Sequence, residues 1–162
     1  DSIEFYKRMP DYIKNKFLVR CSPNDLEWAN EKQRWLDTDN DLNFAVSNKI
    51  EDHYKKCRIA IINHDGTPFI ECMSYNYPVI QILKEEYEPL RNSAKKIYDE
   101  LKKAKIYFDN YEDAKNHIIS IWNDVDSWWN SEETISAKKR YIENYIKNSK
   151  KYLEELLINT KI

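Results

Sequence analysis

The sequence of 162 residues contains a single glycine, Gly66. At the usual ~7% glycine, a chain of this length would carry roughly eleven. Motifs that need several glycines at fixed spacing, such as the G-x-G-x-x-G dinucleotide fingerprint and the G-x-x-x-x-G-K-[ST] phosphate loop, are therefore excluded. Whatever glycine contributes to this protein, it contributes at position 66 alone.

The sequence also lacks a long apolar run, a charge imbalance and a set of paired cysteines. No apolar stretch approaches the ~18 residues of a membrane span, and residues 1–20 have no signal-peptide pattern. Lys plus Arg total 26 against 28 Asp plus Glu, a net charge of -2, so nothing indicates a nucleic-acid partner. The odd count of cysteines (Cys21, Cys57, Cys72) is typical of reduced thiols in a cytoplasmic protein.

Histidines and cysteines do not have the spacing of a metal site. His53, His64 and His117 form no zinc-type pattern with the cysteines, so we expect no metal and no other cofactor. Cys72 lies on a helix face that we expect to be buried, and no histidine pairs with it in the sequence pattern. We therefore do not expect a thiol nucleophile.

Short apolar runs alternate with amphipathic stretches in the first half, a pattern typical of β-α units and a parallel sheet. The pattern predicts strands over 17–21, 42–46, 58–62 and 79–83, with 106–108 as a fifth candidate, and helices over about 26–35, 49–57 and 67–75. The runs at 59–62 and 79–83 are almost continuously apolar. We expect these two strands to be central and buried on both faces.

Helices dominate the chain after Pro89. Apolar residues at spacings of three and four predict one helix from Leu90 to Ala104 and a second from Ala114 to Val125, which Asp109 or Asn110 is placed to cap. A third helix is expected to start at Ser131, with tyrosine and leucine side chains on its apolar side. These residues are Tyr141, Tyr145, Tyr152, Leu153 and Leu156. The predicted fold class is α/β, a Rossmann-like parallel sheet of about 4–5 strands flanked by helices, with a helical C-terminal extension.

The aromatic residues Trp122, Trp128 and Trp129 suit the stacking of a sugar ring. Such residues more often belong to a core, and we expect them to anchor the C-terminal helices on the α/β layer or on a partner domain. The tyrosine stripe of the third helix has the same interpretation.

The segment 61–83 predicts a strand, a tight turn, a helix, a second turn and a strand. Gly66 lies in the first turn, where the backbone can approach a ligand without a Cβ. Thr67 can cap the helix, and Pro68 suits its first turn. A helix that begins at the carboxyl end of a parallel strand directs its free N–H groups toward the ligand crevice of an open α/β sheet. A phosphate fits there.

Glu71 follows Thr67 by four residues, on the same side of the predicted helix. Its carboxylate can accept hydrogen bonds from the vicinal hydroxyls of a ribose. A site that binds both a phosphate and a ribose is a nucleotide site. The residues alone leave open a plainer alternative, in which Gly66 only makes a turn, Thr67 only caps and Glu71 is only solvated.

Other residues adjoin this predicted site. Arg20 ends a strand and is either a phosphate clamp or a partner in a surface ion pair. His64 and Asp65 lie in the turn, within reach of a sugar or phosphate. Asp25 is better placed to cap the following helix than to bind a ligand.

Residues 63–71, followed by Asn76-Tyr-Pro78 and an apolar strand, resemble the donor-binding C-terminal half of GT-B glycosyltransferases such as the peptidoglycan N-acetylglucosaminyltransferase. In those enzymes a glycine turn precedes a helix whose glutamate binds the donor ribose. Over nearly its full length, the chain also resembles a family of bacterial surface-carbohydrate transferases of the lipopolysaccharide O-antigen type. The matching segments are Leu18-Val-Arg20, Ser22-Pro-Asn-Asp25, Trp28, Trp35, Tyr54-Lys-Lys-Cys-Arg58, Gly66-Thr67, Glu71, residues 87–94, Ile106-Tyr-Phe-Asp109 and residues 121–129.

This resemblance implies transfer of a sugar from a nucleotide-activated donor to a cell-surface glycan. Residues 1–109 are then a Rossmann-like nucleotide-sugar-binding domain, on which helices of residues 110–162 pack in one structural unit. The implied donor-binding residues are Arg20, Asn24, Asn63, His64, Asp65, Gly66, Thr67 and Glu71. Asn24 stands where we expect the family's histidine, and an amide does not exchange a proton near neutral pH.

The resemblance also implies an N-terminal GT-B domain that carries the acceptor site and the general base. Because the chain begins with Asp1 rather than Met, we expect a fragment that is not active alone. It belongs in the cytoplasm, and peripheral association with the inner face of the membrane is left open. The competing interpretation is a nucleotide-binding or structural module without turnover in a surface-carbohydrate assembly system. A flavodoxin-like or receiver-like domain is disfavoured, because the first strand has no acidic cluster.

Overall fold

A computed structural model describes residues 2–21, 30–46, 51–84, 86 and 89–146, and the description below is confined to them. The first half contains α1 (Ser2–Lys7), α2 (Asp11–Lys14), β1 (Leu18–Val19), α3 (Glu31–Leu36), β2 (Asn43–Phe44), α4 (Glu51–Tyr54), β3 (Ala60–Ile62), α5 (Thr67–Ser74) and β4 (Val79–Ile82). The second half contains α6 (Asn92–Lys103), β5 (Tyr107–Phe108), α7 (Tyr111–Ile121), α8 (Val125–Trp129) and α9 (Glu132–Tyr145). The chain is therefore an α/β protein, as predicted.

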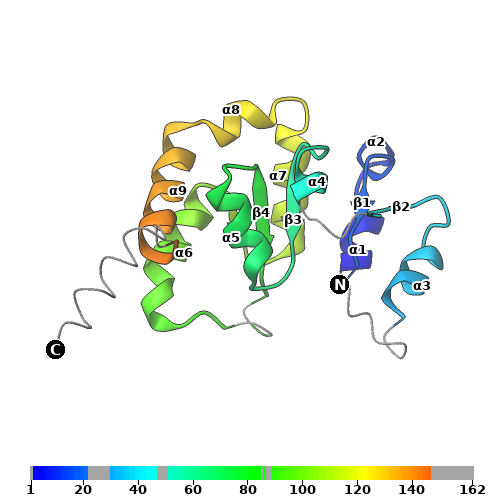
Figure 1. Ribbon diagram of the computed structural model, residues 1–162, viewed down its shortest axis with the longest axis horizontal. Coiled ribbons are helices and arrows are strands. Elements are labelled where there is room, and N and C mark those ends of the chain that lie inside the picture. Colours follow the sequence, from blue (N-terminus) through cyan, green and yellow to red (C-terminus); the bar gives the residue numbers. More distant parts are fainter. Residues whose placement is uncertain (1, 22–29, 47–50, 85, 87–88, 147–162) are drawn as a thin grey trace.

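The strands form two small parallel sheets (Figure 1). β1 pairs with β2, and the second sheet has the order β3-β4-β5. All five predicted strands occur, but the described residues do not join them into one sheet of 4–5 strands. The physical reason is that the β1–β2 sheet has a core cluster of its own, in which Val19 packs with Tyr6 and Trp35.

Only one of the two strands predicted to be central is central. All four residues of β4 are buried, and it has a partner on each side. β3 is an edge of its sheet, and Ala60 and Ile61 are half-buried. The expectation was wrong for β3. An apolar run indicates that other elements pack on both faces of a strand, but it does not indicate whether the strand pairs at both edges.

Helices cover both faces of the β3-β4-β5 sheet (Figure 1). On one face, Val79 and Leu83 pack against α5, α6 and α9. On the other, Ile80 and Ile82 pack against α1 and α7. Successive strand residues point to opposite faces, so the unbroken apolar run of β4 fills both cores.

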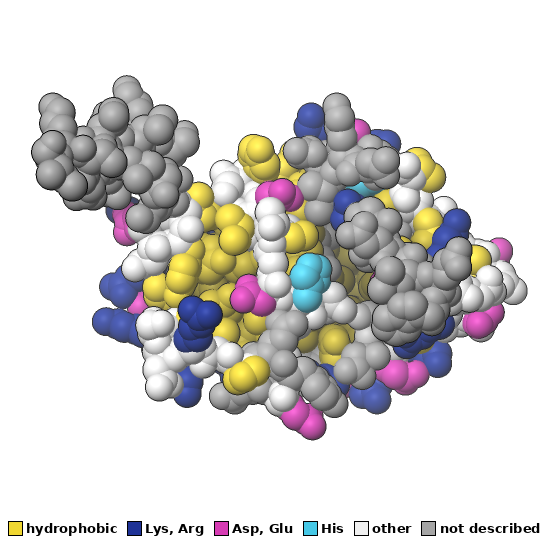
Figure 2. Space-filling model, turned by 60° about the horizontal axis from the view of Figure 1, so that its bottom comes forward, with side chains coloured by type: hydrophobic (Ala, Val, Ile, Leu, Met, Phe, Trp, Pro, Cys, Tyr) yellow, Lys and Arg dark blue, Asp and Glu magenta, His cyan; other side chains and the backbone are white. Residues whose placement is uncertain are grey.

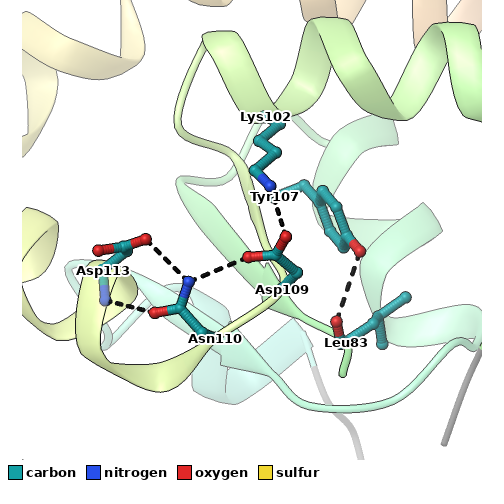
Figure 3. Close-up of polar contacts among 6 residues, drawn as sticks. All are labelled: Leu83, Lys102, Tyr107, Asp109, Asn110 and Asp113. Carbon is teal, nitrogen blue, oxygen red and sulfur yellow. Dashed lines mark hydrogen bonds and ion pairs between the residues drawn. The ribbon is translucent and has the colours of Figure 1, made fainter. Parts of the chain in front are cut away.

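The junction between β5 and α7 is held by polar contacts (Figure 3). Of the two cap candidates, Asn110 is the cap, since its side-chain oxygen accepts from the Asp113 N–H at 2.8 Å. The Asp109 carboxylate instead forms an ion pair with Lys102. The Tyr107 hydroxyl donates to the Leu83 carbonyl at 3.4 Å and so links β5 to the end of β4.

The C-terminal helices are anchored largely as predicted. Ser131 caps α9, and its hydroxyl oxygen accepts from the Thr134 N–H at 3.4 Å. The indole N–H of Trp128 donates to the Ala104 carbonyl at 3.0 Å, and that of Trp129 donates to the Asn76 carbonyl at 3.0 Å. The outer part of the predicted third helix, with Tyr152, Leu153 and Leu156, lies outside the described residues.

Candidate functional site

A cavity of about 580 Å³ lies between the two sheets. Arg20, which directly follows β1, lines it together with Asn63 and His64, which directly follow β3. Strands of both sheets therefore line the same cavity along their length, and residues at the carboxyl end of each are part of its wall. In open α/β sheets, ligands bind beyond the carboxyl ends of the strands, at the point where the strand order reverses. The volume is within the ~300–1,000 Å³ usual for ligand sites.

The walls of the cavity are apolar and aromatic, and its charged groups are mainly basic. The aromatic residues in the wall are Phe5, Tyr12, Phe17, Trp35, Tyr54, Tyr111 and Trp122. The cations are Lys16, Arg20, Lys56 and Arg58, and among the described residues the wall contains one carboxylate, that of Glu31. Such a lining suits a ligand that combines an apolar or aromatic body with negative charge.

Arg58 and Trp122 form one wall of the cavity. Nη1 of Arg58 donates a hydrogen bond to the Trp122 carbonyl at 2.6 Å, and the guanidinium lies 5.4 Å from the centre of the indole ring. The cation also lies at the carboxyl end of α7, where the helix dipole favours positive charge. Trp122 thus differs from Trp128 and Trp129, because it contributes to the cavity as well as to the packing of a helix.

The turn after β3 is held by short polar contacts. The Asn63 side-chain amide donates to the Ser2 hydroxyl at 2.5 Å, which connects this turn to the start of α1. The Asn63 oxygen lies 3.4 Å from Nδ1 of His64. Both Asn63 and His64 are exposed, so their remaining polar atoms face solvent and the cavity. Figure 2, which brings the bottom of Figure 1 forward, shows a histidine and acidic side chains among hydrophobic ones on this side of the molecule.

α5 begins at Thr67 with Gly66 as its N-cap, so the prediction that Thr67 caps the helix was wrong. Glycine has no side chain, and the first turn of α5 has no side-chain cap. Pro68 lies in that first turn as predicted. Gly66 has extended backbone with φ 177°, which other residues also adopt; a Cβ there would lie 3.0 Å from Cδ2 of His64. The glycine therefore leaves room for the His64 ring.

Glu71 is half-buried on α5, one turn after Thr67, and its charge acts on Tyr54. Burial, a hydrogen bond with Cys72 and the Glu71 charge raise the pKa of Tyr54 above its ordinary value, and Arg20 opposes them. The Tyr54 hydroxyl donates to the Pro68 carbonyl at 3.2 Å and so ties α4 to the first turn of α5. Arg20 and Glu71 are thus both within electrostatic range of one hydroxyl in the cavity wall.

Several predicted residues do not line the cavity. Gly66, Thr67 and Glu71 are not among its lining residues, although Pro68 in the same helix turn is. Asp65 is exposed and does not line the cavity. Burial raises the pKa values of Tyr98 on α6 and Tyr141 on α9, and the Asp65 charge adds to both shifts. The charge of Asp65 thus acts on the tyrosines of α6 and α9. Asn24 and Asp25 lie outside the described residues.

Cys72 is fully buried on the inner face of α5, and burial raises the pKa of its thiol to about 11. The thiol is therefore protonated near neutral pH and is not a nucleophile, because the thiolate is the reactive form. All three cysteines are free thiols. Within the described ranges, no three His, Cys, Asp or Glu side chains are grouped as a metal site would require, and no helix is long and apolar enough to cross a membrane.

Comparison with known protein families matches residues 1–160 to the LIC12162 family transferase. The chain belongs to this family. Membership supports a transferase, and hence an enzyme, over a purely structural module. No curated protein and no solved structure matches the chain.

The sequence patterns did not predict several residues of the site. Ser2 and Arg58 were not predicted as site residues, because their contacts are with Asn63 and Trp122, far along the chain. Tyr54 was noticed only within the pattern Tyr54-Lys-Lys-Cys-Arg58 and not as a wall of the cavity. Short helices such as α1 and α2 have too few turns to give a clear periodicity, and the residues they bring to the cavity were missed with them.

Proposed function

We propose that this chain carries the donor-nucleotide site of a GT-B-type glycosyltransferase, which transfers a sugar from a nucleotide-activated donor to a cell-surface glycan. One observation carries the proposal: the ends of β1 and β3, with Arg20, Asn63 and His64, meet at one cavity beside the uncapped start of α5. Membership of a transferase family agrees with it.

In this proposal, the donor phosphates bind at the first turn of α5, where backbone N–H groups and the helix dipole favour an anion, and Arg20 binds them from the β1 side. Glu71 accepts hydrogen bonds from the ribose hydroxyls. The aromatic and apolar wall of the cavity receives the base.

The chemical step breaks the bond between the sugar C1 and the phosphate oxygen and forms a bond from C1 to an acceptor hydroxyl. Negative charge grows on the leaving nucleotide, and Arg20 with the α5 N–H groups stabilises it. The acceptor hydroxyl gives its proton to a general base, which we assign to an N-terminal domain outside this chain. This scheme uses no metal, and it places the enzyme in the cytoplasm, associated peripherally with the inner face of the membrane.

Calorimetric titration with UDP, GDP, ADP and CMP tests the site. We expect at least one to bind, and Glu71→Ala, which removes the acceptor, to weaken binding roughly 5- to 160-fold, which corresponds to the ~1–3 kcal/mol of a lost hydrogen bond to a charged group. Glu143→Ala, which removes an exposed carboxylate on α9, is the matched control and should bind as the wild type does. No binding at millimolar nucleotide by a folded protein would refute the donor site.

Binding alone does not distinguish a transferase from a nucleotide-binding module without turnover. The nucleotide that binds is therefore tested as its sugar conjugates, in the longest natural form of the protein, for release of free nucleotide. Release that Arg20→Ala abolishes supports transfer; tight binding with no release in the presence of cell-surface glycan favours the module.

A further inference from the structure

The central strand β4 contains one polar side chain, Gln81, between apolar neighbours. Gln81 is 0% exposed, like Val79 and Ile80 beside it. It faces the core formed by α5, α6 and α9, since residues two apart share a face with it and Val79 and Leu83 lie in that core. A buried amide in the middle of a central strand requires an explanation.

The amide is bonded to the turn that carries the candidate site. Nε2 of Gln81 donates to the His64 carbonyl at 3.3 Å. Gln81 lies opposite Ile62, the last residue of β3, so its side chain reaches the turn immediately after that strand. This bond links the centre of the sheet to the peptide just before Gly66 and α5.

The carbonyl oxygen of the Gln81 amide lowers the stability of the folded chain. Oε1 of Gln81 is buried and has no hydrogen-bond partner among the described residues. An unsatisfied buried acceptor is unfavourable, whereas an apolar side chain of similar shape in its place is close to neutral or stabilising. Stability alone would therefore favour methionine or leucine at position 81.

We propose that Gln81 is a positioning residue, which holds the His64 carbonyl inward and thereby sets the β3–α5 turn for binding of the donor phosphate. The peptide between His64 and Asp65 is planar and trans, so fixing its carbonyl toward Gln81 turns its N–H to the opposite side of the turn. The same constraint sets the direction in which the chain enters α5. This proposal rests on the donor site proposed above.

The test compares Gln81→Met, which keeps length and burial but removes the amide, with Val79→Ala. Val79 lies on the same face of β4, is fully buried and pairs with Ala60, at the end of β3 away from the turn, so Val79→Ala controls for destabilisation. Three quantities are measured in each full chain: the urea midpoint, the Kd of the best-binding nucleoside diphosphate, and the backbone amide signal of Gly66. The protein has one glycine, so this signal is isolated in a nitrogen-proton correlation spectrum and reports on the turn directly.

We expect Gln81→Met to keep or raise the urea midpoint, to weaken nucleotide binding roughly 10-fold, and to shift or broaden the Gly66 signal more than Val79→Ala does. Val79→Ala should lower the midpoint and leave the Kd unchanged. An unmoved Gly66 signal with wild-type affinity would overturn the proposal, as would a loss of affinity that simply follows the loss of stability in both variants. If the wild type binds no nucleotide, the proposed function fails, and a Gly66 signal moved by Gln81→Met still supports the positioning of the turn.

Discussion

The buried imidazole of His117 makes the stability of this fold depend on pH in a way that the structure predicts. His117 lies on α7 with 7% of its surface exposed, between the rings of Phe108 at 5.6 Å and Trp128 at 5.0 Å. Neither ring nitrogen has a hydrogen-bond partner among the described residues. Burial, with a smaller contribution from Lys105, lowers its pKa from the ordinary 6.5 to about 4.

The direction of the pH dependence of stability follows from proton binding to His117. Between pH 4 and 6.5 the unfolded chain binds a proton at His117 and the folded chain does not, so the free energy of unfolding rises with pH across this window and is level above it. At pH 4.5 the lost stability is about 2.5 kcal/mol relative to pH 7.5, since one pKa unit corresponds to ~1.4 kcal/mol.

Urea unfolding at pH 7.5 and pH 4.5 measures this loss, with His117→Leu as the test variant. Carboxylates also titrate in this range. They do so in both proteins, so their contribution cancels when the stability changes of wild type and variant are subtracted. We expect the wild type to lose about 2.5 kcal/mol more than His117→Leu. His64→Gln removes an exposed histidine and should behave as the wild type does. Equal pH dependence in wild type and His117→Leu would refute the reasoning.

Further predictions concern the turn, a helix cap and the core. Gly66→Val places a branched side chain against the His64 ring, 3.0 Å from the Cβ position, and should weaken nucleotide binding more than it lowers the urea midpoint; normal binding would make the glycine a simple turn residue. Asn110→Ala removes the acceptor of the Asp113 N–H and should cost about 1 kcal/mol in urea unfolding, with no loss if the cap is replaced by water. Phe69→Ala empties a fully buried position and should cost about 3–5 kcal/mol; a cost under ~1 kcal/mol would mean that α5 is not packed as described.

Local patterns predicted the elements of this fold better than their pairing. Each of the five strands occurs near its apolar run, because the apolar side chains of the run itself favour a buried strand. Asn110 and Ser131 were found as caps for a similar reason, since a cap bonds to N–H groups within three residues. The separation into two sheets was not predicted, because it depends on which strand edges meet.

In the candidate site, too, the sequence predicted single residues better than their arrangement in space. Arg20, Asn63 and His64 were predicted from the ends of apolar runs, and the structure brings them to one cavity. Asp65 was grouped with them because it is their neighbour in the chain, but it does not line the cavity, and its charge acts on Tyr98 and Tyr141 instead.

By itself the sequence determined that multi-glycine phosphate loops are absent, that the chain is α/β, and that a helix opens directly after Gly66. Those features depend on residues a few positions apart. Only the tertiary structure decided that β1 and β3 line a shared cavity, that Tyr54 and Arg58 form its walls, and that the Gln81 amide holds the turn from the core. These contacts join residues far apart in the chain, and their formation depends on how sheets and helices pack rather than on any local pattern.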